Sequence, residues 1–142
     1  GRRAAAGATS WLAVIDIDHF KRVNDQHGHP VGDRVLAGLG TVLRSMPQEP
    51  GMTCARYGGE EFAILLPSTT LDRAQQLAEA VRTRVHGIRL RDRQTQAVAL
   101  SVTVSAGVAA LRQGEDADTW VSSADEALYR SKAGGRDRVM VA

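Results

Sequence analysis

Residues 53–66 read TCARYGGEEFAILL, in which Gly58 and Gly59 separate two short runs rich in apolar residues. Two adjacent glycines between such runs are typical of a β-hairpin, because glycine adopts the positive φ angles that tight turns need. We therefore expect two strands, Thr53–Tyr57 and Phe62–Leu66, joined by a tight turn.

Two glutamates, Glu60 and Glu61, follow the glycines of this turn directly. Neighbouring residues on a strand point to opposite faces, so one glutamate can serve a metal site above the turn while the other supports it or faces away. A plain hairpin with a polar exit explains the same letters equally well.

Upstream of the hairpin, Trp11–Asp18 is a candidate strand that begins with apolar residues and ends with two acids. Asp16 and Asp18 alternate with Ile17, so the period of a strand puts both carboxylates on one face. Two such carboxylates repel each other unless a cation lies between them, and magnesium prefers hard oxygen ligands. A strand end that turns into solvent is the alternative interpretation.

Hydrophobic periodicity predicts the remaining elements. Steps of three and four residues predict helices, and alternation predicts strands. The predicted helices are Phe20–Gln26 and Gly32–Met46, a third that is capped by Thr69 and buries Leu71, and a fourth that is capped by Asp118 and runs to Lys132. The predicted strands are a half-buried one through Val98–Val104 and a short one at Arg138–Val141. We expect a loop or minor hairpin at His86–Gln96 and a frayed lead-in at Gly1–Ser10. This order predicts an α+β fold with an antiparallel-rich central sheet flanked by helices, closest to ferredoxin-like topologies.

Composition limits the class of protein. The 142 residues fit one domain, residues 1–142, and their 43% hydrophobic content can build a proper core. A net charge of +2 with scattered arginines does not indicate a nucleic-acid surface. No apolar run approaches the roughly 18 residues that cross a bilayer, so we expect no direct membrane contact. The single cysteine, Cys54, excludes an internal disulfide and favours a cytoplasmic setting. Because the chain begins without methionine, we expect it to be part of a longer protein, which can itself be membrane-tethered.

Cations and an amide–carboxylate pair complete the candidate site. Lys21, Lys132 and Arg136 suit a triphosphate, because lysine offers a point charge and arginine a bidentate fork. Asn24 and Asp33 can read the edge of guanine, with the carboxylate accepting from its N–H groups. Each also has a structural explanation, as favourable charge or capping at a helix end.

Taken together, five ordered motifs resemble the GGDEF family of diguanylate cyclases in its GGEEF spelling, over about Leu12–Val141. The motifs are Asp16–Asp25 with Gly28-His29 and Gly32-Asp33, Arg56–Phe62, Ser105–Val108, Ala124–Tyr129, and Lys132 with Gly135-Arg136. The resemblance implies a polymerase-palm-like fold and an enzyme of bacterial second-messenger signalling that condenses two GTP into cyclic di-GMP and two pyrophosphates. It implies a homodimer in which two domains face each other, with a sensor or dimerisation domain upstream.

The resemblance also implies residue roles. Two ions of Mg²⁺ or Mn²⁺ per active site would be held by Asp16, the carbonyl of Ile17, and Glu60 with Glu61, these two glutamates being the catalytic pair. The nucleotide would be bound by Asn24 and Asp33 at guanine, by Lys21, Lys132 and Arg136 at the phosphates, and by backbone N–H groups near His19 and Phe20. The carboxylate of Asp33 predicts a preference for GTP over ATP.

Two departures from the family pattern bear on regulation and stability. Pro50 and Thr53 stand where many members carry the Arg and Asp of a product-inhibition site, so that site is degenerate and we expect no feedback inhibition through it. The usual opening turn is missing, with Arg2-Arg3 as a remnant. The competing interpretation is a catalytically silent module that binds GTP or cyclic di-GMP. A related nucleotide cyclase is a further rival, which the guanine-reading pair disfavours.

Overall fold

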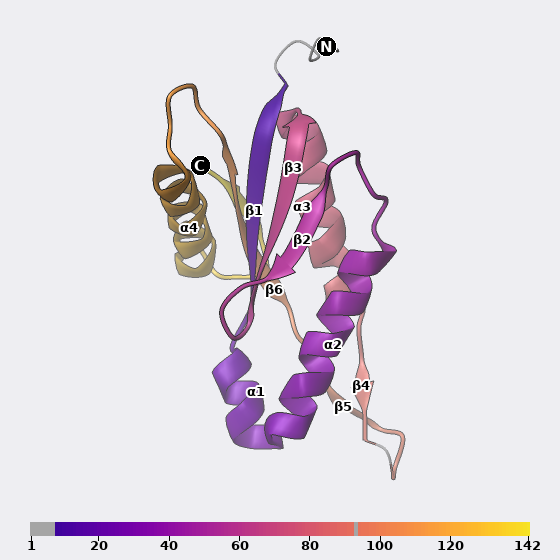
Figure 1. Cartoon of the computed structure of the whole chain (residues 1–142). Helices are drawn as coiled ribbons and strands as arrows, with labels where there is room; N and C mark the ends of the chain where they lie inside the picture. The colour runs from indigo at the N-terminus through magenta and orange to yellow at the C-terminus, as the bar shows by residue number, and fades with distance from the viewer. Residues whose placement is uncertain (1–7, 93) are drawn as a thin grey trace.

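The computed structural model describes residues 8–92 and 94–142, and it confirms the α+β class (Figure 1). The elements along the chain are β1 (Thr9–Ile17), α1 (Phe20–His27), α2 (His29–Ser45), β2 (Thr53–Arg56), β3 (Glu61–Thr69), α3 (Leu71–His86), β4 (Leu90–Arg91), β5 (Val98–Leu100), β6 (Val104–Ala110), α4 (Ala117–Ala133) and β7 (Val139–Val141). Five strands form one sheet in the order β2-β3-β1-β6-β7, and β4 pairs with β5 in a separate hairpin. Neighbours in the large sheet are antiparallel except β6 and β7, which are parallel. No described helix is long and apolar enough to cross a membrane.

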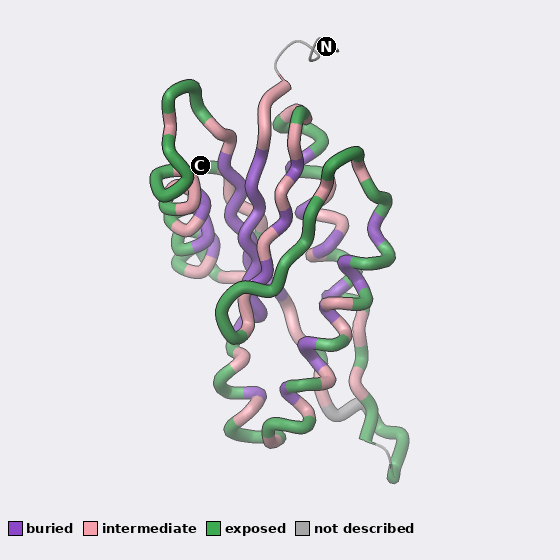
Figure 2. Tube along the Cα trace, in the orientation of Figure 1, coloured by how far each residue is buried: buried purple, intermediate pink, exposed green. Residues whose placement is uncertain are grey.

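Strand β1 lies at the centre of the sheet and is buried from Trp11 to Ile17, where Figure 2 colours it purple. Ile15 and Ile17 pack into the larger hydrophobic core, which α2 and α3 complete. Leu12 and Val14 pack into a second cluster on the opposite face, under α4. This two-sided burial explains why the strand is apolar without interruption until Asp16.

Helix α4 lies unusually close to the sheet, and Gly107 of β6 makes this possible. A Cβ atom at position 107 would lie 2.3 Å from the carbonyl oxygen of Ala124 and from the amide nitrogen of Leu128. Real Cβ atoms do not approach backbone this closely. A glycine at this position therefore sets how α4, and with it Lys132, sits against the end of β1.

Several predicted boundaries were wrong, each for a local reason. β1 begins at Thr9, so the lead-in is ordered at Thr9 and Ser10, while residues 1–7, including Arg2-Arg3, lie outside the described part. Helix α2 begins at His29, because Pro30 is tolerated in the first helical turn, where its missing N–H has no intrahelical partner anyway. Strand β3 continues through Pro67, at the register shift opposite Thr9–Trp11, where a proline removes no ladder bond.

The helix caps and the last strands also differ from expectation. Thr70, not Thr69, caps α3, and Leu71 is 41% exposed. Asp116, not Asp118, caps α4 by accepting from the Thr119 N–H at 2.8 Å. The alternating stretch Val98–Val104 is not one half-buried strand, because β5 pairs with β4 in the minor hairpin and a new, fully buried strand begins at Val104.

Candidate active site

The predicted site residues converge at one end of the large sheet. The loop between β2 and β3, the end of β1 and the start of α1 lie together there (Figure 1). The carboxyl end of α4 reaches the same place through an ion pair between Lys132 and Asp16. Residues separated by more than a hundred positions thus meet at the end of the central strand.

The acidic centre of the site is formed by Asp16 and Glu61, which are register partners on β1 and β3. Asp16 is only 4% exposed, and its Oδ2 accepts a hydrogen bond from the Lys132 ammonium. Among the described residues, its Oδ1 has no hydrogen-bond partner although it is buried. A buried, unpartnered carboxylate oxygen is costly, so this atom is suited to a ligand that brings positive charge.

The electrostatics at Glu61 agree with this reading. Burial raises the pKa of Glu61 above its ordinary value, the charges of Asp16 and Asp125 raise it further, and Lys132 partly offsets them. Two carboxylates that crowd one another on neighbouring strands favour a divalent cation between them. The residues present therefore fit a divalent metal ion at Asp16 and Glu61.

The other glutamate of the turn is Glu60, whose charge is close enough to raise the pKa of Glu61. It lines a cavity of about 350 Å³ together with residues of α1 and α2. The turn that carries it is held by Arg56, whose guanidinium donates two hydrogen bonds to the Gly59 carbonyl at 3.1 and 2.7 Å. Within the described residues, no three His, Cys, Asp or Glu side chains gather as a metal-binding group. The set of Asp16, Glu60 and Glu61 as joint metal ligands therefore stays a prediction.

The predicted guanine-reading pair is brought together by α1 and α2. Asn24 and Asp33 both line the cavity that contains Glu60. The Oδ1 atom of Asn24 is buried and has no hydrogen-bond partner in the described part of the chain. A Cβ atom at Gly32 would lie 1.9 Å from this oxygen, so the glycine makes room for the amide. Gly32 appeared in the sequence motif, but only the structure shows this role.

The predicted phosphate-binding groups surround the same end of the sheet. Lys21 lies at the rim of the cavity, 91% exposed in its side chain, and is paired with Asp25 at 2.9 Å. Helix α1 begins at Phe20, and its N-cap residue, His19, makes no side-chain cap hydrogen bond. The first N–H groups of a helix without a side-chain cap, together with the helix dipole, suit an anion.

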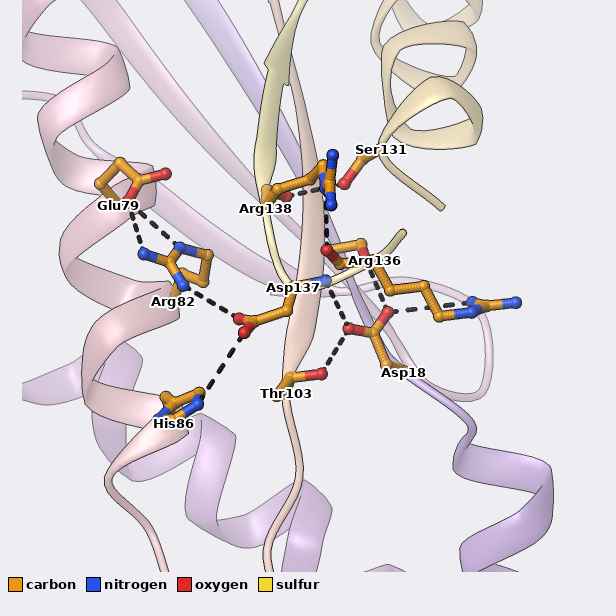
Figure 3. Close-up of polar contacts among 10 residues, drawn as sticks. Asp18, Glu79, Arg82, His86, Thr103, Ser131, Arg136, Asp137 and Arg138 are labelled. Atoms are coloured by element: carbon orange, nitrogen blue, oxygen red, sulfur yellow. Dashed lines mark hydrogen bonds and ion pairs between the residues drawn. The ribbon is translucent and has the colours of Figure 1, made fainter. Parts of the chain in front are cut away.

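Asp18 is as buried as Asp16 but is not available to a metal. Its Oδ2 accepts from the Thr103 hydroxyl at 2.6 Å and from the Asp137 N–H at 3.1 Å, and its Oδ1 accepts from the Ser105 hydroxyl at 2.7 Å (Figure 3). The sequence indicated a pair of acids sharing one cation. Instead, hydroxyl and amide donors from distant segments satisfy Asp18, and no local sequence signal identified Thr103 or Asp137 as its partners.

The two positions at which we expect a degenerate product site lie away from these groups. Thr53 begins β2 opposite Leu65, at the end of the hairpin remote from the glycine turn, and Pro50 is in the exposed turn before it. Neither side chain carries a charge that could hold a phosphate. Their contribution to regulation stays a prediction.

Comparison with known proteins gives a consistent result. The family described as "Diguanylate cyclase, GGDEF domain" matches residues 2–138. Diguanylate cyclase DgcP of Pseudomonas aeruginosa is 43% identical over 141 residues, which cover 99% of this chain but only 20% of that protein. This chain thus spans about a fifth of that curated relative.

Two solved structures are similar to this chain in both fold and sequence. The GGDEF domain of DgcB from Caulobacter crescentus, in complex with c-di-GMP, is 40% identical with a TM-score of 0.89, covering 96% of this chain and 79% of that one. The active GGEEF domain of a diguanylate cyclase from Vibrio cholerae is 36% identical with a TM-score of 0.81, covering 93% and 81%.

Proposed function

Since the chain belongs to the GGDEF family of diguanylate cyclase domains, we propose that it joins two GTP molecules into cyclic di-GMP and releases two pyrophosphates. The observation that carries this proposal is the pairing of buried Asp16 with half-buried Glu61 beside a cavity lined by Asn24 and Asp33. It combines a place for a divalent cation with a place for guanine.

Asp16 and Glu61 hold divalent metal in this proposal, with the Ile17 carbonyl and Glu60 completing the ligands of two ions of Mg²⁺ or Mn²⁺. When bound, such ions stabilise the charge on the attacking and leaving oxygens of an in-line displacement. Lys132 keeps the Asp16 carboxylate oriented through its ion pair. Glu60, at the cavity edge, is the candidate to accept the proton from the attacking 3′-hydroxyl.

Asn24 and Asp33 bind the guanine, and Lys21, Arg136 and the first N–H groups of α1 bind the phosphates. The carboxylate of Asp33 accepts from the N1–H and amino group of guanine, which adenine cannot offer together. We therefore expect a strong preference for GTP over ATP, and equal turnover of the two nucleotides would overturn this assignment. The GTP bound to a second copy of the domain supplies the 3′-hydroxyl that attacks the α-phosphate and displaces pyrophosphate, so turnover depends on dimerisation, which an upstream segment can promote.

A product assay tests the proposal. The purified chain is incubated at high concentration with GTP and Mg²⁺, and the nucleotides are separated and identified by mass spectrometry. We expect cyclic di-GMP from the parent and about 100-fold less from Glu61→Gln, because one carboxylate ligand is lost. Glu126→Gln, on the exposed face of α4, is the matched control and retains activity. Glu60→Gln is expected to lose activity as well, because Glu60 is proposed both as a metal ligand and as the acceptor of the 3′-hydroxyl proton.

The rival function is a silent module that binds GTP or cyclic di-GMP. The intact glycine turn and the loss of charge at Pro50 and Thr53 argue against it, because a sensor would be expected to keep its product site. Metal-dependent GTP binding without product, even after the domain is fused to a dimerising segment, would favour the silent module. Inhibition by low concentrations of added cyclic di-GMP would contradict a degenerate product site.

A further inference from the structure

The turn that follows α4 has an unfavourable backbone. Arg136 and Asp137 have φ angles of 64° and 47°, although neither is a glycine. The left-handed region is disfavoured for residues with a Cβ atom, and two such residues in succession persist only where contacts hold them. The turn therefore requires specific anchors, and it carries Arg136, the arginine proposed to bind phosphate.

Asp18 supplies an anchor at the centre of this turn (Figure 3). The Asp137 N–H donates to Oδ2 of Asp18 at 3.1 Å, and Nη1 of Arg136 lies 3.9 Å from Oδ1. The Asp18 side chain is only 2% exposed, and hydroxyls of Thr103 and Ser105 hold it in place. The carboxylate thus contacts both the backbone beside Arg136 and the Arg136 guanidinium.

Other contacts secure the two flanks of the turn. The Ser131 hydroxyl and the Ala106 N–H both donate to the carbonyl of Arg138, at 2.7 and 3.0 Å. The carboxylate of Asp137 accepts from Arg82 of α3 at 3.0 Å (Figure 3). These contacts fix where the turn lies, whereas Asp18 also faces the guanidinium itself.

A metal-binding role for Asp18 fits the structure less well. Each of its oxygens already accepts a hydrogen bond from a hydroxyl and faces a further donor, an N–H or a guanidinium. The equally buried Asp16 keeps one oxygen that accepts no hydrogen bond from the residues that the structure describes. The Arg136 side chain, in contrast to Asp18, is 37% exposed. It is therefore accessible to a ligand while its Nη1 atom faces the Asp18 carboxylate.

We propose that Asp18 is a positioning residue, whose buried carboxylate holds the turn at Arg136 and Asp137 and aims the Arg136 guanidinium at the phosphates of the bound nucleotide. This inference rests on the proposed function, in which Arg136 binds phosphate. It predicts that Asp18 affects nucleotide binding through Arg136 and not through the metal. The same logic assigns Thr103 and Ser105 as the residues that hold Asp18.

A double-mutant cycle tests this coupling. Asp18→Asn keeps the shape of the side chain and one oxygen for the Asp137 N–H, but removes the charge that faces Arg136. We expect it to raise the Kd for the α,β-methylene analogue of GTP, with Mg²⁺, about tenfold, and to change it less than about twofold in an Arg136→Ala background. Asp118→Asn, an exposed carboxylate on α4, is the matched control and leaves the Kd unchanged. An equal loss of affinity in both backgrounds would overturn the proposal.

A second measurement needs no nucleotide. The side-chain Nε–Hε signal of Arg136, identified by its absence in Arg136→Ala, is compared by NMR in the parent and in Asp18→Asn. We expect a shift and faster hydrogen exchange in the variant, and an unchanged signal would refute positioning. If Asp18→Asn does not fold, Ser105→Ala replaces it, with an expected rise in Kd of about threefold that again depends on Arg136.

The two measurements separate the inference from the proposed function. If Arg136→Ala binds the analogue as tightly as the parent, Arg136 does not bind phosphate, and Asp18 does not orient it for that purpose. If Arg136→Ala weakens binding and the NMR signal does not respond to Asp18→Asn, the phosphate role stands and the positioning role falls.

Discussion

Asp16 and Asp18 lie two residues apart at the end of the central strand, and each is 4% exposed, yet their surroundings differ completely. The region around Asp18 closes on the carboxylate with two hydroxyls and a backbone N–H. The region around Asp16 provides one lysine and places Glu61 opposite, and within residues 8–92 and 94–142 it leaves one oxygen without a partner.

The difference separates a structural carboxylate, Asp18, from one that is suited to bind a ligand, Asp16. Burial alone does not distinguish them, because both are removed from water. Only the count of donors around each oxygen does, since a satisfied buried charge stabilises a local arrangement and an unsatisfied one attracts a ligand.

The largest expected effect comes from Asp16→Asn. We expect product formation to fall by about 100-fold or more, because the variant loses a metal ligand and the charge that holds Lys132. Asp18→Asn, tested in the same assay at saturating GTP, should reduce kcat far less. Equal losses of kcat in the two variants would show that the two regions do not differ in the way proposed.

A substitution at Gly107 should disturb the surroundings of Asp16 indirectly, by displacing α4 and its Lys132. In Gly107→Ala the added methyl group meets the backbone of α4, so we expect the free energy of unfolding to fall by about 2 to 3 kcal/mol, with reduced activity because Lys132 shifts. Urea denaturation followed by circular dichroism measures the first effect. Gly38→Ala in α2 is the control, because its Cβ would make only an ordinary 3.6 Å contact with Cδ1 of Ile88. A neutral Gly107→Ala would contradict the close packing of α4.

Removing one donor from Asp18 should mainly affect stability. Thr103→Val keeps the shape of the side chain and deletes the hydroxyl at 2.6 Å, so we expect a loss of about 1 to 2 kcal/mol in the free energy of unfolding. We expect kcat at saturating GTP to change by less than about twofold. A large fall in kcat with unchanged stability would mean that Asp18 takes part in the chemistry.

The smallest effect concerns the pH dependence of Glu61. Its pKa is raised in the folded chain by burial and by neighbouring acids, so the folded state binds more protons than the unfolded state between the two pKa values. The free energy of unfolding should therefore decrease as the pH rises through this window. Thermal melts from about pH 4 to about pH 7 would show it. Both Mg²⁺ and Glu61→Gln should make this decrease in the free energy of unfolding smaller. If the free energy of unfolding of the parent only rises with pH over this range, as it does when carboxylates have lowered pKa values, the result would argue against the acidic pair.

Much of the fold followed from local patterns. Periodicity predicted all four helices and the hairpin at Gly58-Gly59, because an amphipathic helix and a glycine turn each leave a signal within a few residues. The boundaries at His29, Thr70 and Asp116 were missed by one to three residues, since neighbouring residues of similar capping ability compete and packing selects among them.

The candidate site was predictable in composition but not in arrangement. The motifs around Asp16, Asn24 and Glu60 identified the residues that converge at the end of the sheet. They did not separate Glu60, at the cavity lined by Asn24, from Glu61, opposite Asp16, because that choice depends on the register between β1 and β3.

The sequence by itself determined the family, the α+β class and the set of charged residues that the site draws on, because these depend on residue identity and spacing. Only the tertiary structure decided which carboxylate is satisfied and which is open. Thr103, Ser105 and Asp137 are at least 85 positions away from Asp18 and reach it only after β6 and the turn after α4 have packed against β1. Hydrogen-bond satisfaction is a property of three-dimensional neighbours, and no pattern along the chain encodes it directly.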